Sequence, residues 1–201
     1  MTHHSDMIAA LVGSRICHDL ISPAGAVSNG IELLGMAGTT DGPEMQLLRD
    51  SAATTNARIR LFRLAFGQAS DGQGVARDEI TGLLSKLYEN GRIRIATFPD
   101  QDFDRVQAKA LILAVLCAEH ALPFGGQLRV SIHEGLFQIR AESDRLGADP
   151  ALWALLQGDP TTDAQDVPPS AVEFLLLPRL LGRMGRRCEV QITGKTAEIT
   201  F

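Results

Sequence analysis

Two long stretches of helical periodicity, separated by a short break, occupy the first third of the chain. From residue 7 to residue 36, apolar side chains recur every three or four positions, which is the spacing of one face of an α-helix. A second stretch with this spacing runs from about residue 44 to residue 66. The segment GMAGTTDGP between them is rich in glycine and ends in Pro43, residues that terminate helices. The pattern predicts two antiparallel helices joined as a hairpin.

A single helical hairpin of this length leaves part of both apolar stripes exposed to water. Pairing with the hairpin of a second copy gives a four-helix bundle, the simplest arrangement that covers them. We therefore expect residues 1–69 to form a homodimer through a four-helix bundle.

The second part of the chain follows a different pattern, beginning after the glycine-rich linker GQASDGQG at residues 67–74. Helices are predicted at about 77–89, 103–122, around Trp153 and at 171–184, and strands from Arg92 and at 128–133, 136–143, 188–193 and 196–201. The order predicts an α+β domain at 76–201, with helices on one face of a largely antiparallel sheet.

Composition excludes several classes of function. The net charge is −5, and the arginines at positions 58, 60 and 63 are too few for a nucleic-acid surface, so they are predicted to lie on a solvated helix face. Three widely spaced cysteines without a C-x-x-C motif indicate reduced thiols. Without a secretory leader or an apolar run of the ~20 residues that span a bilayer, the chain is expected to be cytoplasmic and free of membranes.

The stretch RICHDLISPAGAVSNGIELL at residues 15–34 combines a histidine with residues that disfavour helices. Because a helix turns about 100° per residue, His18 lies about 200° from Ile16 and Leu20, away from the main apolar stripe. Pro23 clashes with the carbonyl of Asp19 and should kink the helix, and Gly25 lowers helix stability. From the periodicity alone, a surface histidine on an imperfect helix explains this stretch as well as a functional site does.

His18-Asp19-Leu20-Ile21-Ser22-Pro23 resembles the phosphoacceptor box of sensor histidine kinases, in which an acidic residue follows the histidine and proline stands at the fifth position. The order of a hairpin followed by a mixed domain is also similar to these kinases. The resemblance implies that His18 accepts phosphate, and that Asp19 orients it or acts as a base. Since neighbouring helical residues do not face each other, a rotamer adjustment near the kink is then required.

The second half resembles the ATP-binding domain of these kinases with its nucleotide-binding residues replaced. His120 takes the place of an asparagine, and AESDRLGAD has Asp144 and Gly147 without the usual glycine spacing. VPPSAVEF stands where a glycine-rich turn is found, and Pro168 and Pro169 supply no N–H groups for phosphate. We therefore expect no direct use of ATP. His120 and His133 are expected to be structural, and Gly125 and Gly126 to form a turn.

A kinase-like protein without a nucleotide site is similar to the bacterial histidine phosphotransferases of the ChpT type. The segments CHDLISPAGAVSNGIELL and ALPFGG resemble motifs of that family. The resemblance implies a phosphorelay protein that accepts phosphate from the receiver domain of a hybrid histidine kinase and passes it to response regulators similar to CtrA and CpdR. It also implies no bound cofactor or metal, with Mg²⁺ held only by the partner receiver.

Residues around His18 on the same side of the helix are candidates for receiver contact. They are Ser14, Arg15, Ile21, Ser22, Gly25 and Asn29. A solvated face explains Ser22 and Asn29 equally well.

Two other functions remain open. A divergent histidine kinase would phosphorylate His18 from ATP alone, and a non-catalytic dimeric adaptor would keep its function after His18→Gln.

Overall fold

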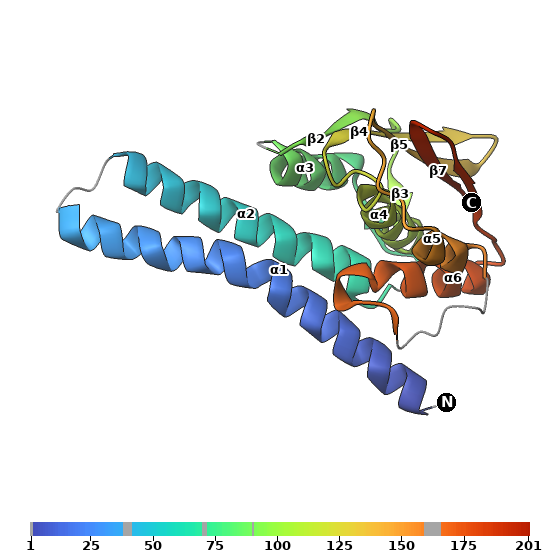
Figure 1. Ribbon diagram of the computed structural model, residues 1–201, viewed down its shortest axis with the longest axis horizontal. Helices are drawn as coiled ribbons and strands as arrows, with labels where there is room; N and C mark the ends of the chain where they lie inside the picture. Colours follow the sequence, from blue (N-terminus) through green and yellow to red (C-terminus); the bar gives the residue numbers. More distant parts are fainter. Residues whose placement is uncertain (1, 38–41, 70–71, 90, 159–165) are drawn as a thin grey trace.

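The computed structural model describes residues 2–37, 42–69, 72–89, 91–158 and 166–201, so parts of the predicted break and linker lie outside the described residues. Helices α1 (Thr2–Ala37) and α2 (Pro43–Phe66) pack against each other as the predicted hairpin. Figure 1 shows that one end of this hairpin projects away from the rest of the protein.

Helix α1 continues through Pro23 rather than ending there. Because the proline ring removes one N–H donor and crowds the preceding turn, the helix bends at such a residue. Figure 1 shows α1 changing direction near the middle of its length, as the sequence predicted. Further along, Gly30 allows α1 and α2 to approach closely, since a Cβ atom there would lie 2.7 Å from Cγ of Leu48.

The C-terminal domain is built on a five-stranded sheet that is largely antiparallel, as predicted. Its strands, in spatial order, are β2 (Ile93–Thr97), β4 (Gly126–His133), β5 (Leu136–Glu142), β7 (Thr196–Thr200) and β6 (Glu189–Ile192). Among the strands of the described residues, only β2 and β4 pair in parallel. The β4–β5 hairpin turns at Glu134 and Gly135, whose φ angles of 52° and 79° suit a tight turn between twisted strands.

The helices of this domain lie on one face of the sheet, as predicted (Figure 1). They are α3 (Arg77–Tyr88), α4 (Arg105–Glu119), α5 (Pro150–Leu156), the short 3₁₀ helix η2 (Pro169–Ala171) and α6 (Glu173–Arg183). Helix α4 begins two residues later than predicted. Asp104 caps it by accepting from the N–H of Gln107, and β3 (Phe103–Asp104) pairs with β1 (Gly74–Val75) instead.

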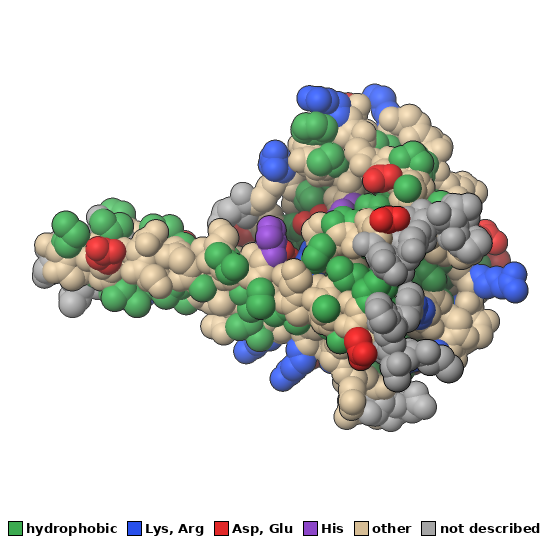
Figure 2. Space-filling model, turned by 60° about the horizontal axis from the view of Figure 1, so that its bottom comes forward, with side chains coloured by type: hydrophobic (Ala, Val, Ile, Leu, Met, Phe, Trp, Pro, Cys, Tyr) green, Lys and Arg blue, Asp and Glu red, His purple; other side chains and the backbone are tan. Residues whose placement is uncertain are grey.

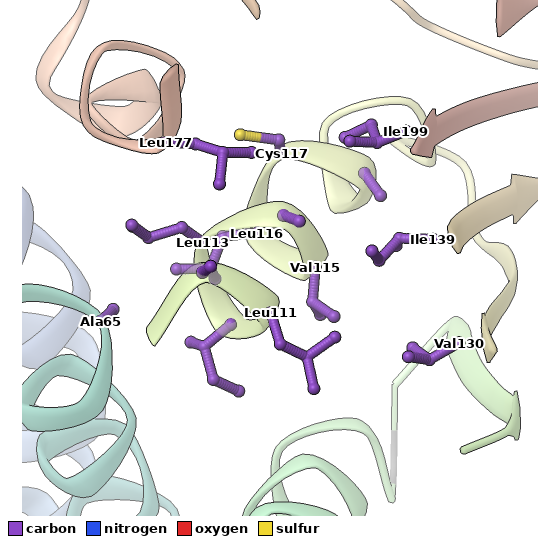
Figure 3. Close-up of a cluster of buried hydrophobic side chains, with 14 of the residues drawn as sticks. Ala65, Leu111, Leu113, Val115, Leu116, Cys117, Val130, Ile139, Leu177 and Ile199 are labelled. Carbon is purple, nitrogen blue, oxygen red and sulfur yellow. The ribbon is translucent and has the colours of Figure 1, made fainter. Parts of the chain in front are cut away.

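Helix α4 is the centre of the hydrophobic core. Every residue from Ala110 to Ala118 is buried, so this helix is enclosed by apolar neighbours on all sides. Figure 3 shows side chains of the sheet on one side of α4, with Leu177 of α6 and Ala65 of α2 on other sides. The C-terminal half of α2 therefore belongs to the core of the second domain.

Polar contacts also hold the C-terminal end of α2 on the second domain. Arg105 Nη2 donates to the Arg63 carbonyl, and Lys109 Nζ donates to the Gly67 carbonyl, both at 2.7 Å. Cations are favourable at this end of a helix, where carbonyls lack helical partners. Burial, followed by the nearby Arg105 and Arg183, lowers the pKa of Lys109. The hairpin is thus fixed at its base and projects at its other end.

The described helices include none that combines the length and the hydrophobicity needed to cross a membrane.

The three cysteines are unpaired and differ in exposure, which predicts their reactivity. Cys17 is exposed, whereas Cys117 and Cys188 are buried. Burial raises the pKa of the Cys117 thiol well above its usual value and that of Cys188 to about 12. Since only a thiolate reacts readily, we expect dithionitrobenzoate to modify one thiol of the native protein and all three after unfolding. Cys17→Ser should remove the fast-reacting thiol, and any fast-reacting thiol left in that variant would contradict the burial of Cys117 and Cys188.

Candidate functional site

His18 lies on the surface of α1 with 80% of its side chain exposed. Ser14, Ser22 and Gly25 around it are also exposed, and all three are small. Ile21, one turn further, is 70% exposed, which is unusual for a large apolar side chain. The small neighbours therefore leave the imidazole open to a protein partner, and Ile21 offers that partner an apolar contact.

The His18 ring is oriented by the residue that follows it. Its Nδ1 is hydrogen-bonded to Oδ1 of Asp19 at 3.0 Å, so the pairing expected from the resemblance forms despite the adjacent helical positions. An ionised carboxylate can only accept a hydrogen bond, so Nδ1 carries the proton of the neutral ring. The second nitrogen, Nε2, is then unprotonated and has a free lone pair.

Asp19 is itself held by two arginines. Its Oδ2 lies 2.9 Å from Nε of Arg15, one helical turn earlier, and 3.6 Å from Nη1 of Arg58 on α2. The Arg15 contact is an ion pair and not a hydrogen bond, because Arg15 Nε has no hydrogen-bond partner among the described residues. The two oxygens of Asp19 thus have separate tasks: Oδ2 faces the arginines and Oδ1 faces the histidine.

Arg15 connects this site to the C-terminal domain. Its Nη1 donates to the carbonyl of Ser170 in η2 and lies 3.7 Å from Oε1 of Glu173 at the start of α6. The same Oε1 is hydrogen-bonded to Nε2 of His120 at 2.8 Å. The Glu173 side chain is fully buried, with 0% exposed. Five side chains therefore form one polar chain from the surface of α1 into the second domain.

The predicted receiver contacts differ in exposure. Arg15 is only 11% exposed, because its guanidinium is directed at Asp19, Ser170 and Glu173 and not at solvent. Asn29 is exposed, like Ser14, Ile21, Ser22 and Gly25.

The positions that resemble a nucleotide site are occupied by contacts within the protein. His120 pairs with Glu173, and its ring meets the edge of Phe174 with centroids 5.3 Å apart. Gly147 donates to the Ala121 carbonyl, and a Cβ atom on it would lie 2.4 Å from Pro123. Asp144 pairs with Lys195 at 2.7 Å. His133 is exposed at the end of β4, away from this cluster of contacts.

Gly125 closes the predicted turn, where its N–H donates to the Leu122 carbonyl, and Gly126 begins β4. Their φ angles are +95° and +152°, and added Cβ atoms would lie 2.5 Å from the Arg92 carbonyl oxygen and 2.3 Å from that of Glu142. Close approach of backbone to backbone requires glycine at both positions. The pair is thus explained by packing and not by phosphate binding.

A cavity of about 360 Å³ opens between the hairpin and the C-terminal domain beside Asp19. Arg58, Tyr88 and Glu119 are among the polar residues that line it. Tyr88 donates to Glu119 at 2.8 Å. Burial, followed by the charge of Glu119, raises the pKa of Tyr88 well above its usual value, so its hydroxyl remains a donor.

Sequence reasoning missed two residues of the site. Arg58 was predicted to lie on a solvated face, but it contacts Asp19 and its side chain is 35% exposed. Glu173 carried one recognisable signal, a single acidic residue in the apolar run AVEFLLL. A carboxylate within such a run is expected to be paired.

Together, a projecting helical hairpin with an exposed, oriented histidine and an α/β domain behind it define a protein of phosphotransfer signalling. Residues 77–196, more than half of the chain, match the histidine phosphotransferase C-terminal domain family. The chain belongs to the histidine phosphotransferases of phosphorelay signalling. It is 31% identical over 179 residues to the protein phosphotransferase ChpT of Brucella abortus (strain 2308), with 81% of each chain covered.

A solved structure extends this similarity to the whole fold. It is described as the 1.7 Angstrom structure of a bacterial phosphotransferase, and it is 25% identical with a TM-score of 0.75. The alignment covers 96% of this chain and 94% of that one, so both the hairpin and the C-terminal domain are shared.

Proposed function

We propose that His18 is the phosphoacceptor of this histidine phosphotransferase, receiving phosphate from an aspartate of a receiver domain and passing it to response regulators. The observation that carries the proposal is the 3.0 Å hydrogen bond between His18 Nδ1 and Asp19, on a ring that is 80% exposed. A neutral imidazole held in this way presents Nε2 as a nucleophile at the surface.

In the proposed reaction, the lone pair of Nε2 attacks the phosphorus of the receiver's phospho-aspartate. An N–P bond forms as the P–O bond to the aspartate breaks, and the receiver carboxylate leaves. The phosphorylated ring carries a positive charge, which the Asp19 carboxylate stabilises through the Nδ1–H group. Transfer to a second receiver reverses these steps. The receiver supplies Mg²⁺ and a lysine, since such reactions depend mainly on positioning and charge neutralisation.

We propose further that the protein does not use ATP. The positions corresponding to the kinase nucleotide site support this, because His120, Asp144 and Gly147 each make a contact within the protein. Pro168 precedes η2 with no N–H group to offer a phosphate, and Pro169 begins that helix.

The exposed side of α1 around His18 supports docking of a receiver. Ile21 offers an apolar contact, and Ser14, Ser22 and Asn29 offer polar ones. Transient interfaces combine such residues around a shallow surface. The partners proposed are the receiver of a hybrid histidine kinase and separate response regulators.

The projecting end of the hairpin supports the proposed homodimer. Figure 2 shows hydrophobic side chains spread along this end. Its large exposed apolar residues are Ile31, Leu33, Met36 and Leu47. Ile31, which belongs to the apolar stripe of the first helix, is 60% exposed in the single chain. A second hairpin packed here would bury these residues.

The dimer can be tested by placing charge on this end. We expect Ile31→Glu with Met36→Glu to give a monomer, because two carboxylates would have to be buried between the hairpins. Light scattering coupled to gel filtration measures the mass. Glu substitution of Phe124, an exposed residue of the C-terminal domain, is the matched control and should leave the mass unchanged. A wild-type protein of 21.7 kDa would contradict the dimer.

The function is tested by incubating the protein with a receiver domain that carries radiolabelled phosphate, with ATP alone as a parallel reaction. We expect label on the protein from the receiver and none from ATP. Label from ATP alone would identify a divergent histidine kinase. Absence of label from both sources would favour a non-catalytic adaptor.

A further inference from the structure

We propose that Arg15 and Glu173 are positioning residues for phosphoryl transfer, through which the C-terminal domain sets the orientation and the tautomer of His18. The inference rests on the proposed function, because it concerns how the phosphoacceptor is prepared. It assigns to the second domain a direct task in the chemistry of the hairpin.

The two oxygens of Asp19 have different partners, His18 on Oδ1 and arginines on Oδ2. Oδ1 accepts from His18 at 3.0 Å, while Oδ2 lies 2.9 Å from Arg15. Rotation of the carboxylate would break both contacts, so Arg15 fixes the direction in which Oδ1 points. Without Arg15, Oδ2 would keep only the longer contact of 3.6 Å to Arg58, and the carboxylate would rotate more easily, since the final torsion of aspartate is broad. His18 would then lose the acceptor that keeps the proton on Nδ1.

Arg15 is in turn immobilised by the other domain. Its guanidinium donates to the Ser170 carbonyl and lies 3.7 Å from Glu173. Asp19 and Arg15 come from α1, whereas Ser170 and Glu173 come from η2 and α6. The guanidinium is therefore a bridge whose far end is fixed by the C-terminal domain. A planar fork with several donors can hold both sides in one geometry.

The Glu173 carboxyl group is fully buried, with its partners around it. A buried carboxylate is costly unless it is paired. Glu173 Oε1 is paired with His120 at 2.8 Å and faces Arg15, while Oε2 has no hydrogen-bond partner among the described residues. An apolar residue at this position would pack in the core but could not hold Arg15. The carboxyl group of Glu173 thus stands where it meets the guanidinium of Arg15.

The link is not needed merely to attach the two domains. The buried C-terminal half of α2 and the contacts of Arg105 and Lys109 already fasten the hairpin. The chain of side chains through Arg15 ends instead at the exposed histidine. This placement indicates a role in orienting the phosphoacceptor.

The test combines the tautomer of His18 with the rate of transfer. Long-range ¹H–¹⁵N spectra of the unphosphorylated protein report which ring nitrogen carries the proton. Single-turnover transfer from a saturating phosphorylated receiver reports the rate, and titration of the receiver reports its affinity. Both are compared for wild type, Arg15→Gln, Glu173→Gln and Arg15→Lys. Arg60→Gln, on an exposed arginine of α2, is the matched control.

We expect wild type and Arg60→Gln to hold the neutral proton on Nδ1. Arg15→Gln and Glu173→Gln should shift it toward Nε2 and slow transfer about tenfold to 100-fold, as is typical when a residue that orients a functional histidine is lost. Receiver affinity should change less than about twofold, and Arg15→Lys should recover part of the rate. An unchanged tautomer and rate in Arg15→Gln would overturn the proposal. A weaker affinity at an unchanged rate would also overturn it, by making Arg15 a receiver contact.

These measurements distinguish failure of a variant to fold from failure of the proposed function. If Glu173→Gln does not fold, Arg15→Gln still tests the proposal. The Arg15 side chain keeps 11% exposure, whereas Glu173 is fully buried. If wild type accepts no phosphate from a receiver, the proposed function fails. The tautomer comparison still tests the positioning inference in that case, because it needs no phosphate.

Discussion

Replacing His18 by glutamine is expected to abolish phosphoryl transfer from a receiver while leaving the fold intact. The glutamine amide resembles imidazole in size and polarity, but its nitrogen has no lone pair available for attack. Because 80% of the His18 side chain is exposed, its replacement should change the free energy of unfolding by no more than about 0.5 kcal/mol. Transfer of label and thermal unfolding, measured on the same preparation, check both parts.

His133→Gln is the matched control for this variant, since it makes the same change at an exposed histidine of β4. It should accept phosphate at the wild-type rate. Label on His18→Gln at the wild-type level would place the acceptor elsewhere and refute the assignment.

Leu111→Ala is expected to have the largest effect on stability, lowering the free energy of unfolding by about 2–5 kcal/mol. Leu111 is 0% exposed on α4, between the sheet and the helices, so its truncation leaves a cavity that close-packed neighbours cannot fill. Urea unfolding measures the loss. A smaller value would mean that the core around α4 can collapse onto the shorter side chain.

Leu136→Ala makes the same chemical change at a residue that is 49% exposed at the start of β5. Its free energy of unfolding should stay within about 0.5 kcal/mol of wild type. Equal losses for the two variants would contradict the central position of α4 in the core.

The elements that the sequence predicted correctly are those specified by local patterns. Helices α1 and α2 follow from periodicity, and the β4–β5 hairpin follows from two strands around Glu134 and Gly135. The sequence predicted that α4 begins at about Phe103. Asp104 accepts from Gln107 and fixes the start at Arg105, a choice between neighbouring residues that periodicity does not resolve.

In the functional site, sequence patterns likewise identified adjacent residues but did not predict contacts between residues far apart in the sequence. His18 and Asp19 are adjacent in the sequence, and a motif identified both. Arg15 was assigned to the receiver surface because only its helical spacing from His18 was known. Its partner Ser170 is 155 positions away, and no periodic pattern predicts such a contact.

The most direct test of the central claim is to locate the phosphate on the protein after transfer from a receiver. Peptide mass spectrometry under alkaline conditions identifies the modified residue, and ³¹P and ¹⁵N spectra identify the modified nitrogen. We predict phosphate on His18, bonded to Nε2, because Asp19 occupies Nδ1 at 3.0 Å. Phosphate on another residue, or on Nδ1 of His18, would contradict the proposed mechanism.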